Sequence, residues 1–455
     1  AFVQVKLDHA IIGKFLPFPV AARLLRVRHA LSRSTGAQLS FCFALWQHQA
    51  YAAPLARSRS RRSPGAAPIS PETGLPSPLV ISSIPAANAV AREAWSRLCP
   101  VGHPFLNADF LAIIERHGAA APAWGWTPRH LVASDERGAV VGLLPLYGKT
   151  HSHGDFIYDW AWAAAYRQIG RQYYPKLMSC IPHTPVAGPR ILVGQGPDAV
   201  AIRQALIDGA RTLAIRSGAS SWHVALPGDD EIPLLERAGL LLSHDVQFHW
   251  EDPGCGDFDG YLATFSAAKR RKVRAERRQV QDSGLSVETR HGDQIEPAEW
   301  PLLHALYTST FEKFNNHAAF SADCFADLGA NLGRRMVAFI ARDRGLPVAV
   351  ALCFRSDEAL YGRYWGCREH YPSLHFELCF YQGIAYCLRE GLRRFEPGAG
   401  GEHKLARGFT PIVVHSAHWI ADPYMRQVLD RHLALQGGQV ADYREQAAAH
   451  LPFRR

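Results

Sequence analysis

An internal repeat constrains the fold of this 455-residue chain more than any other feature. Two β-hairpins share one pattern: an apolar run, a four-residue charged turn that ends in glycine, and a second apolar run. The turns occupy residues 135–138 and 342–345, which places Gly138 and Gly345 207 residues apart. Glycine suits the end of such a turn because it adopts positive φ at little cost. The repeat therefore predicts two copies of one structural unit.

Each hairpin is later followed by an amphipathic helix, a glycine that can end that helix, and a short strand. We therefore expect an α/β (α+β) fold of two tandem units, with mixed, largely antiparallel sheets flanked by helices. Two helices, at 86–98 and 107–117, precede the first copy. The expected elements lie at 130–134, 139–147, 199–217 and 222–226 in the first copy and at 336–341, 347–354, 359–365, 376–390 and 393–396 in the second.

Charge divides the chain into a basic head and a balanced remainder. The net charge is +9, and residues 1–70 carry ten Lys and Arg against one acid, Asp8, while the other residues hold forty charges of each sign. The head runs into an Arg/Ser/Pro-rich stretch that cannot bury a core. We expect residues 1–78 to be a basic extension, disordered or not native to the protein, and two folded domains at 79–255 and 256–455.

Composition excludes several classes of protein. At 47% hydrophobic and 20% charged residues, the chain is neither collagen-like nor wholly disordered. No apolar run approaches about 18 residues, so a transmembrane helix is not expected. The nine cysteines form no C-x-x-C pair and most lie in apolar stretches, which indicates buried thiols and a cytoplasmic location.

The densest polar and aromatic segment is residues 147–162. His151, His153 and Asp155 alternate along this segment, so on an extended strand their side chains would share one face. That alternation permits a metal site, but the usual helical spacing and thiol ligands are absent, so we expect no metal. Two interpretations stay open: a loop that lines a substrate site, or a buried turn whose side chains satisfy backbone groups. The candidate substrate-binding residues are His151, His153, Asp155, Asp159 and Trp160.

A glycine-rich loop at residues 398–408 is the second candidate. Its four glycines expose backbone N–H groups, and Glu402, His403, Lys404 and Arg407 lie among them. Such a loop can bind an anion and offer a general acid or base. The alternative is a flexible solvated loop, and the apolar residues on both sides favour the functional interpretation.

Two nearby segments are expected to form the other wall of this site. One is residues 362–366, with Arg363 and Tyr364, and the other carries His375 and Glu377 at the start of a predicted helix. A carboxylate at a helix start is also favoured by the helix dipole, so Glu377 has a simple capping interpretation.

A long basic helix is predicted at residues 258–281, between the two copies of the repeat. Seven cations and one acid occupy residues 269–278. The shortage of acids favours contact with a polyanion such as a phosphate or RNA, and the alternative is a solvated face. Without interleaved aromatic residues, the helix shows no sign of reading a nucleotide sequence. The candidate contacts are Lys269, Arg270, Arg274 and Arg277.

Several long segments, in the same order along the chain, resemble one family. It is the bacterial FemAB-like family of predicted N-acyltransferases, described as peptidoglycan biosynthesis or recognition proteins and placed in the GNAT superfamily. The resemblance covers nearly all of residues 79–455 and none of 1–70. The segments that carry it are 126–131, 151–162, 173–177, 184–186, 246–250, 362–366 and 401–408.

The resemblance implies a pair of GNAT-like domains and transfer of an acyl or aminoacyl group to an amine, such as that of a cell-wall precursor. The implied co-substrate is acyl-CoA or aminoacyl-tRNA, with no tightly bound cofactor. The pyrophosphate loop usual in GNAT proteins is not visible in either half, and the basic helix would suit a tRNA. The rival interpretation is a non-catalytic GNAT-like protein that recognises a cell-wall peptide or an RNA.

N-acyl transfer needs a neutral amine, a base to take its proton, and N–H donors for the carbonyl oxygen that becomes an oxyanion. We expect Glu402 or His403 to act as the base and the backbone of residues 398–401 to bind the oxyanion or the donor. Tyr364 is the candidate acid for the leaving group. Lys176, in one of the shared segments, joins the expected substrate-binding residues.

Overall fold

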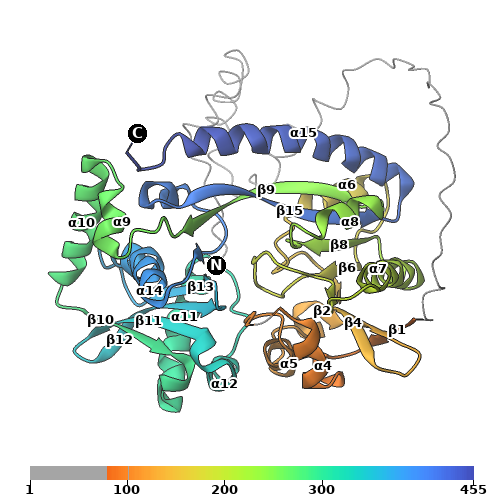
Figure 1. The fold of residues 1–455 in the computed structure, drawn as a ribbon, viewed down its shortest axis with the longest axis horizontal. Coiled ribbons are helices and arrows are strands. Elements are labelled where there is room, and N and C mark those ends of the chain that lie inside the picture. Colours follow the sequence, from red (N-terminus) through yellow and green to blue (C-terminus); the bar gives the residue numbers. More distant parts are fainter. Residues whose placement is uncertain (1–78, 101, 455) are drawn as a thin grey trace, which may run out of the picture. The chain divides into compact units, whose positions relative to one another are not determined.

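A computed structural model of the chain describes residues 79–100 and 102–454 (Figure 1). The expectations for the basic head at 1–78 fall outside these residues. The helices of the described part are α4 (Arg92–Leu98), α5 (Ala108–Arg116), α6 (Trp160–Gln168), α7 (Ala199–Arg216), α8 (Ile232–Arg237), α9 (Phe258–Ala263), α10 (Ala267–Gln281), α11 (Trp300–Lys313), α12 (Ala322–Leu332), α13 (Leu374–Phe376), α14 (Gln382–Glu390) and α15 (Pro423–Ala448). Shorter 3-10 or π turns are η1 (Ala87–Ala89), η2 (Pro122–Trp124), η3 (Gly292–Gln294), η4 (Pro297–Glu299), η5 (Gly333–Arg335), η6 (Glu377–Tyr381) and η7 (Glu402–Arg407).

Two sheets organise the described residues. An antiparallel sheet has the order β1-β3-β4-β7, and a mixed sheet has the order β10-β11-β12-β13-β14-β9-β15-β8-β6-β5-β2. The strands are β1 (Val80–Ile84), β2 (Trp126–Pro128), β3 (His130–Ser134), β4 (Val140–Leu144), β5 (Tyr147–Lys149), β6 (Lys176–Ser179), β7 (Leu192–Val193), β8 (Ser221–Ala225), β9 (Leu241–Glu251), β10 (Ser286–His291), β11 (Met336–Asp343), β12 (Leu346–Arg355), β13 (Ala359–Cys367), β14 (Arg394–Glu396) and β15 (Thr410–Ile420).

The strand arrangement in the large sheet is symmetric about the central pair β9–β15. On one side of this pair lie the parallel strands β14 and β13, and on the other the parallel strands β8 and β6. Parallel neighbours need a crossover connection. Helix α7 supplies it in the first half, and α13, η6 and α14 supply it in the second. The predicted α/β class, with two copies of one unit and mixed sheets, is confirmed.

The two halves exchange their central strands. Strand β9 follows the first half but pairs with β14, whereas β15 follows the second half and pairs with β8. The two strands also pair with each other, from Thr410 opposite His249 to His418 opposite Leu241, and α15 packs along both (Figure 1). The sheet therefore continues across the expected boundary, and the domain limits at 79–255 and 256–455 stay a prediction.

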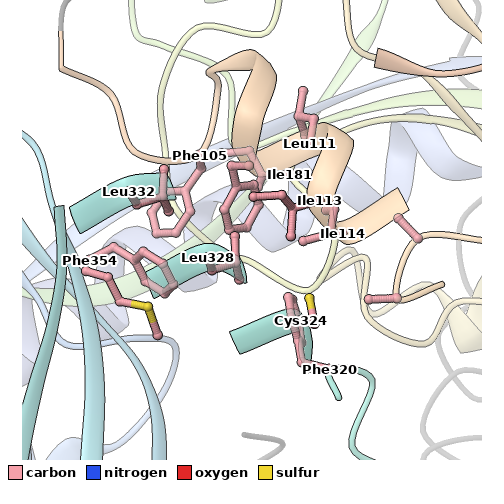
Figure 2. Packing of buried hydrophobic residues seen from close by; sticks show 14 of the residues in the cluster. Phe105, Leu111, Ile113, Ile114, Ile181, Phe320, Cys324, Leu328, Leu332 and Phe354 are labelled. Atoms are coloured by element: carbon pink, nitrogen blue, oxygen red, sulfur yellow. The ribbon is translucent and has the colours of Figure 1, made fainter. Parts of the chain in front are cut away.

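Helices α5 and α12 bring the two halves together in one apolar core. Figure 2 shows Ile114 of α5 and Leu328 of α12 in this cluster, and both side chains are fully buried. Beside them, the rings of Phe105 and Phe354 lie 5.0 Å apart. Burying a large apolar side chain contributes about 1.5–3 kcal/mol. This packing fixes loops from both halves against each other.

Two predicted helices differ from the structure. The single helix expected over 258–281 is wrong, because α9 ends before residues 264–266 and α10 begins after them. At the break, the fully buried Phe265 forms a β-bridge with Phe453, near the end of the chain. The helix expected at 86–98 is also shorter, since the turn η1 precedes α4. By contrast, the side chain of Asn107 caps α5 by accepting a hydrogen bond from the backbone N–H of Phe110 at 2.8 Å.

Candidate active site

A cavity of about 230 Å³ combines residues from both halves of the chain. His151, His153 and His183 line it from loops of the first half, and Tyr307 of α11 and Tyr364 of β13 line it from the second. No Asp or Glu is among the described residues that line it. The structure thus joins three of the predicted site residues, His151, His153 and Tyr364, in the lining of one cavity.

The tautomer of His183 is fixed by a backbone contact. Its Nε2 lies 2.8 Å from the carbonyl oxygen of Ala119, so Nε2 donates there and Nδ1 is the acceptor nitrogen. Nδ1 faces Gly154, where an added Cβ would come within 2.5 Å of it. Burial lowers the pKa of His183 to about 3. The ring is therefore neutral at pH 7 and offers a lone pair beside the cavity.

His151 and His153 lie on the same loop, with ring centroids 5.2 Å apart. The backbone N–H of His153 donates to Nδ1 of His151 at 3.2 Å. Burial, helped by the charge of Lys149, lowers the pKa of His151 to about 4. Trp160, which is 40% exposed, lies with its ring 6.3 Å from that of His153. The rings of His151 and His153 thus form part of the cavity wall, and Trp160 lies behind it without lining the cavity.

Tyr364 of β13 lines the same cavity. Its ring is buried and lies 5.1 Å from that of Tyr307. Burial raises the pKa of Tyr364 to about 12, although the neighbouring Arg363 guanidinium acts in the opposite direction. The hydroxyl therefore stays protonated at pH 7 and can donate a proton or a hydrogen bond. The guanidinium of Arg363 in turn donates to the carbonyl oxygen of His183.

A buried charged cluster surrounds Lys176. Its Nζ lies 2.8 Å from Oδ2 of Asp155, 2.5 Å from Oδ2 of Asp159 and 2.9 Å from Oγ of Ser152. Burial disfavours the charge on Lys176, but the two carboxylates outweigh it and raise the pKa of Lys176. The structure thus brings these three predicted residues together. None of them lines the cavity, so the cluster holds the loop in place.

A chain of hydrogen bonds extends this cluster to the central strands. The hydroxyl of Tyr173 donates to Oδ2 of Asp159 at 2.5 Å and lies 3.1 Å from Nε2 of His223. Nδ1 of His223 and Nδ1 of His418 are 2.8 Å apart, and Nε2 of His418 is 2.8 Å from Oγ of Ser243. Burial lowers the pKa of both histidines. The chain is therefore a buried network of neutral rings that ties the loop to β8, β15 and β9.

Lys149 connects the cluster to the cavity wall. Its Nζ donates to the carbonyl oxygen of His153 at 2.9 Å and lies 3.5 Å from Nδ1 of His151. It also sits 3.7 Å from the ring centroid of Trp126. Burial lowers the pKa of Lys149 to about 8, even though Asp155 favours its charge. Sequence reasoning missed Lys149 as a site residue, although it lies in the polar segment at 147–162.

The glycine-rich loop forms a second region. Glu402 is exposed and accepts a hydrogen bond from the hydroxyl of Tyr443 at 2.8 Å. The ring of His403 lies 5.9 Å from that of His375 and 5.5 Å from that of Phe380. Burial lowers the pKa of both histidines to about 4. Among the described residues, the cavity lining includes neither Glu402 nor His403, so the structure does not bring the predicted bases to Tyr364.

Lys404 and Arg407 of this loop are buried in different ways. Nζ of Lys404 donates to the carbonyl oxygen of Gly398 at 2.6 Å, and burial lowers the pKa of Lys404 to about 7. Nη2 of Arg407 donates to both carboxylate oxygens of Glu276 at 2.9 Å, and its guanidinium lies 3.4 Å from the ring centroid of Phe376. Arg407 is thus neutralised by an acid, whereas Lys404 has no ion pair within the described residues.

The predicted phosphate contacts on α10 divide into two groups. Arg277 pairs with the buried Glu377, with Nη2 3.1 Å from Oε1, and Arg274 lies 3.3 Å from Oδ1 of Asp259. Lys269 and Arg270 form no ion pair in the part of the chain that the structure describes. Glu377, expected to bind substrate, is engaged by Arg277. Of the four predicted contacts, the two in the first turn of α10 are therefore the ones available to an anion.

The site residues that the sequence did not predict differ in how far their local sequence could have revealed them. His183 stands directly before Thr184 in one of the family-like segments, but nothing in the sequence shows that its backbone adopts a φ of 56° beside the cavity. Tyr307 lies in an ordinary amphipathic helix. Its role at the cavity follows from the packing of α11 against β13 and could not be read from local sequence.

A comparison with family profiles tests the resemblance that the sequence suggests. The profile of the FemAB-like family, described as peptidoglycan biosynthesis/recognition, matches residues 86–455. The chain belongs to this FemAB-like family. No curated protein sequence matches it. The described residues include no helix that combines the length and the apolar composition needed to cross a membrane.

Several solved structures are similar to this FemAB-like chain. The C-terminal domain of a putative lysylphosphatidylglycerol synthetase from Agrobacterium fabrum is 12% identical, with 70% of this chain and 90% of that one covered and a TM-score of 0.44. FemX is also 12% identical, with 70% and 97% covered and a TM-score of 0.42. A tandem GNAT protein from the clavulanic acid pathway is 16% identical, with 76% and 99% covered and a TM-score of 0.38. Family membership, and not any one of these structures, supports the functional interpretation below.

Proposed function

We propose that the protein is an N-acyltransferase that moves an acyl or aminoacyl group from an activated donor, acyl-CoA or aminoacyl-tRNA, to an amine, such as that of a cell-wall precursor. One observation carries the proposal. A single cavity of about 230 Å³ is lined by the neutral imidazole of His183, with Nδ1 as acceptor, and by the protonated hydroxyl of Tyr364. Membership of the FemAB-like family supports the same reaction class.

The reaction needs one proton acceptor and one proton donor. The amine nitrogen attacks the carbonyl carbon of the donor, the new N–C bond forms, and the bond from that carbon to the leaving sulfur or oxygen breaks. The nitrogen loses a proton and the leaving group gains one. Nδ1 of His183 is the proposed acceptor and the Tyr364 hydroxyl the proposed donor. Positioned acids and bases of this kind contribute about 10²- to 10⁴-fold to the rate.

The electrostatics of the cavity favour the neutral form of an amine. No carboxylate is among its described lining residues, and burial lowers the pKa of His151, His183 and Lys149. The same desolvation would lower the pKa of an ammonium group that enters the cavity. A bound amine would therefore reach its nucleophilic state more easily than it does in water.

Transfer of a labelled group tests the proposal directly. The full chain would be incubated with radiolabelled acetyl-CoA or aminoacyl-tRNA and with amine-bearing cell-wall peptides, and label on the peptide would be measured. We expect saturable transfer with one donor class and a loss of at least about 100-fold in Tyr364→Phe. Tyr424→Phe, at an exposed tyrosine, is the matched control. A protein that binds peptide or RNA but transfers no label would be a recognition protein, and the proposal would then be wrong.

A further inference from the structure

We infer that Arg363, which contacts the lining residues His183 and Tyr364, forms an anion-binding subsite beside the cavity, and that the molecule carrying the acceptor amine also carries a carboxylate, as an amino acid or a peptide end does. The inference deepens the proposed function and rests on it, because the bound amine is an acceptor only if the protein transfers a group to it. The subsite itself is argued from the geometry of β13 and from the unmet requirements of one buried side chain.

Arg363 is the extra residue of a β-bulge. In the pairing of β12 with β13, Leu352 lies opposite Tyr364 and Cys353 lies opposite Gly362, so Arg363 has no partner in the ladder. In a regular strand, successive side chains point to opposite faces. A bulge re-aims side chains, and bulges are frequent beside active sites. Here the bulge places Arg363 next to Tyr364, which lines the cavity, with its guanidinium 5.2 Å from that ring's centroid.

The guanidinium of Arg363 is buried and incompletely satisfied. The residue is 7% exposed, its Nη2 donates to the carbonyl oxygen of His183, and its Nε has no hydrogen-bond partner within the described residues. No carboxylate pairs with it in that part of the chain. A buried charge without a counter-ion is unfavourable, and an arginine does not escape the cost by losing its proton. An anionic ligand would remove this penalty.

Two other buried arginines show how such a group is normally satisfied. The charge of Arg407 is neutralised by the carboxylate of Glu276, although its Nε, like that of Arg363, has no partner among the described residues. Arg190, which is 1% exposed, donates from all three guanidinium nitrogens to backbone carbonyls, including those of Val186 and Ala225. Arg363 has neither arrangement among the described residues. It is therefore a buried arginine that has both an unpartnered Nε and no counter-ion among the described residues.

The surroundings of Arg363 favour a small anion. The carbonyl that it contacts belongs to His183, a lining residue, and no acid is among the described residues that line the cavity. A volume of about 230 Å³ is below the roughly 300–1,000 Å³ of pockets for drug-sized ligands, so it suits an amino acid or the end of a longer molecule. One guanidinium with an unpartnered Nε matches a carboxylate better than a phosphate, whose additional oxygens would need further donors.

Diamines with and without a carboxylate test the subsite. Binding of lysine, lysinamide and 1,5-diaminopentane to the full chain would be measured by titration calorimetry, with inorganic phosphate as a competitor. We expect lysine to bind about 10- to 100-fold more tightly than lysinamide, which lacks the carboxylate. Arg363→Gln should remove the difference and Arg363→Lys should keep part of it. Arg368→Gln, at an exposed arginine that follows the same strand, is the control and should behave as the wild type.

Several results would overturn the inference. Equal affinity of the wild type for lysine and lysinamide, or no lysine binding at millimolar concentration, would contradict a carboxylate subsite. Displacement of lysine by phosphate with much higher affinity would identify a phosphate site instead. The wild-type comparison decides the question even if Arg363→Gln does not fold. Selective lysine binding without any transfer would refute only the proposed function, and equal transfer to lysine and lysinamide would refute only this inference.

Discussion

Two buried lysines, Lys176 in the first half and Lys404 in the second, have opposite electrostatic surroundings. Lys176 is fully buried between Asp155 and Asp159, whose charges raise its pKa against the effect of burial. Lys404 is 3% exposed, and its amine donates to the carbonyl oxygen of Gly398, while burial lowers its pKa to about 7. The same side chain is thus a fixed cation in one region and titrates near neutral pH in the other.

This difference separates a structural role from a responsive one. A lysine held between two carboxylates anchors the loop that carries His151 and His153, and its charge does not change near pH 7. A buried lysine without an acid changes its charge with small changes of pH or on binding an anion. We therefore expect the Lys176 cluster to determine stability and the glycine-rich loop to determine the response to pH.

The largest expected effect is the loss of stability on removing Lys176. Lys176→Met leaves two carboxylates buried without their counter-ion, which should lower the free energy of unfolding by about 3–5 kcal/mol. Lys404→Met replaces a buried amine that has no ion pair among the described residues by an apolar chain of similar length, so at pH 7 it should leave stability unchanged or raise it. Denaturant unfolding measures both. Equal losses in the two variants would show that the surroundings of the lysines do not differ as described.

The pH dependence of stability sharpens the same comparison. The pKa of Lys404 is about 7 in the folded chain and near its ordinary value of 10.5 when unfolded, so above pH 7 the unfolded state binds the extra proton. Stability should therefore rise with pH between about 7 and 10.5 and be lost as pH falls through the same window. One such group contributes about 2 kcal/mol between pH 7 and 9. Subtracting the gain in stability of Lys404→Met from that of the wild type removes the contribution of Lys149. Equal gains in the two proteins would mean that a counter-ion lies beside Lys404.

The smallest expected effect concerns the basic helix α10. Lys269 and Arg270 have no ion pair among the described residues, whereas Arg274 and Arg277 pair with acids. Replacing the first two with Gln should weaken binding of aminoacyl-tRNA several-fold and reduce its salt slope by about 1.5–2. Replacing the second two is the matched control and should have a smaller effect on the slope. Identical slopes in all variants would make α10 a solvated face.

The repeat could be predicted because its signals are local. Each charged turn is stabilised within a few residues: Oδ1 of Asp135 accepts from the backbone N–H of Arg137 at 3.0 Å and of Ala139 at 2.8 Å, and Gly138 has a φ of 78°. The hairpins, the helices after them and the return strands follow from such patterns. The polar segment with His151 and His153 was found in the same way, from alternation along one strand.

Features that depend on distant partners could not be predicted. The exchange of β9 and β15 pairs residues such as His249 and Thr410, whose local sequences carry no sign of each other. The break between α9 and α10 depends on Phe265 meeting Phe453. Likewise, the acceptor nitrogen of His183 is defined by the carbonyl of a residue 64 positions earlier in the chain. Each of these is a tertiary contact that overrides or completes a local pattern.

The central claim is that chemistry takes place in the cavity between the halves and not at the glycine-rich loop. Turnover of labelled donor by Tyr364→Phe, compared with Glu402→Gln and His403→Asn, tests it most directly. We expect Tyr364→Phe to lose about 10²- to 10⁴-fold in kcat while donor affinity and stability stay unchanged, and the two loop variants to keep rates near that of the wild type. A wild-type rate in Tyr364→Phe together with a collapse of turnover in Glu402→Gln or His403→Asn would contradict the claim and place the base in the loop.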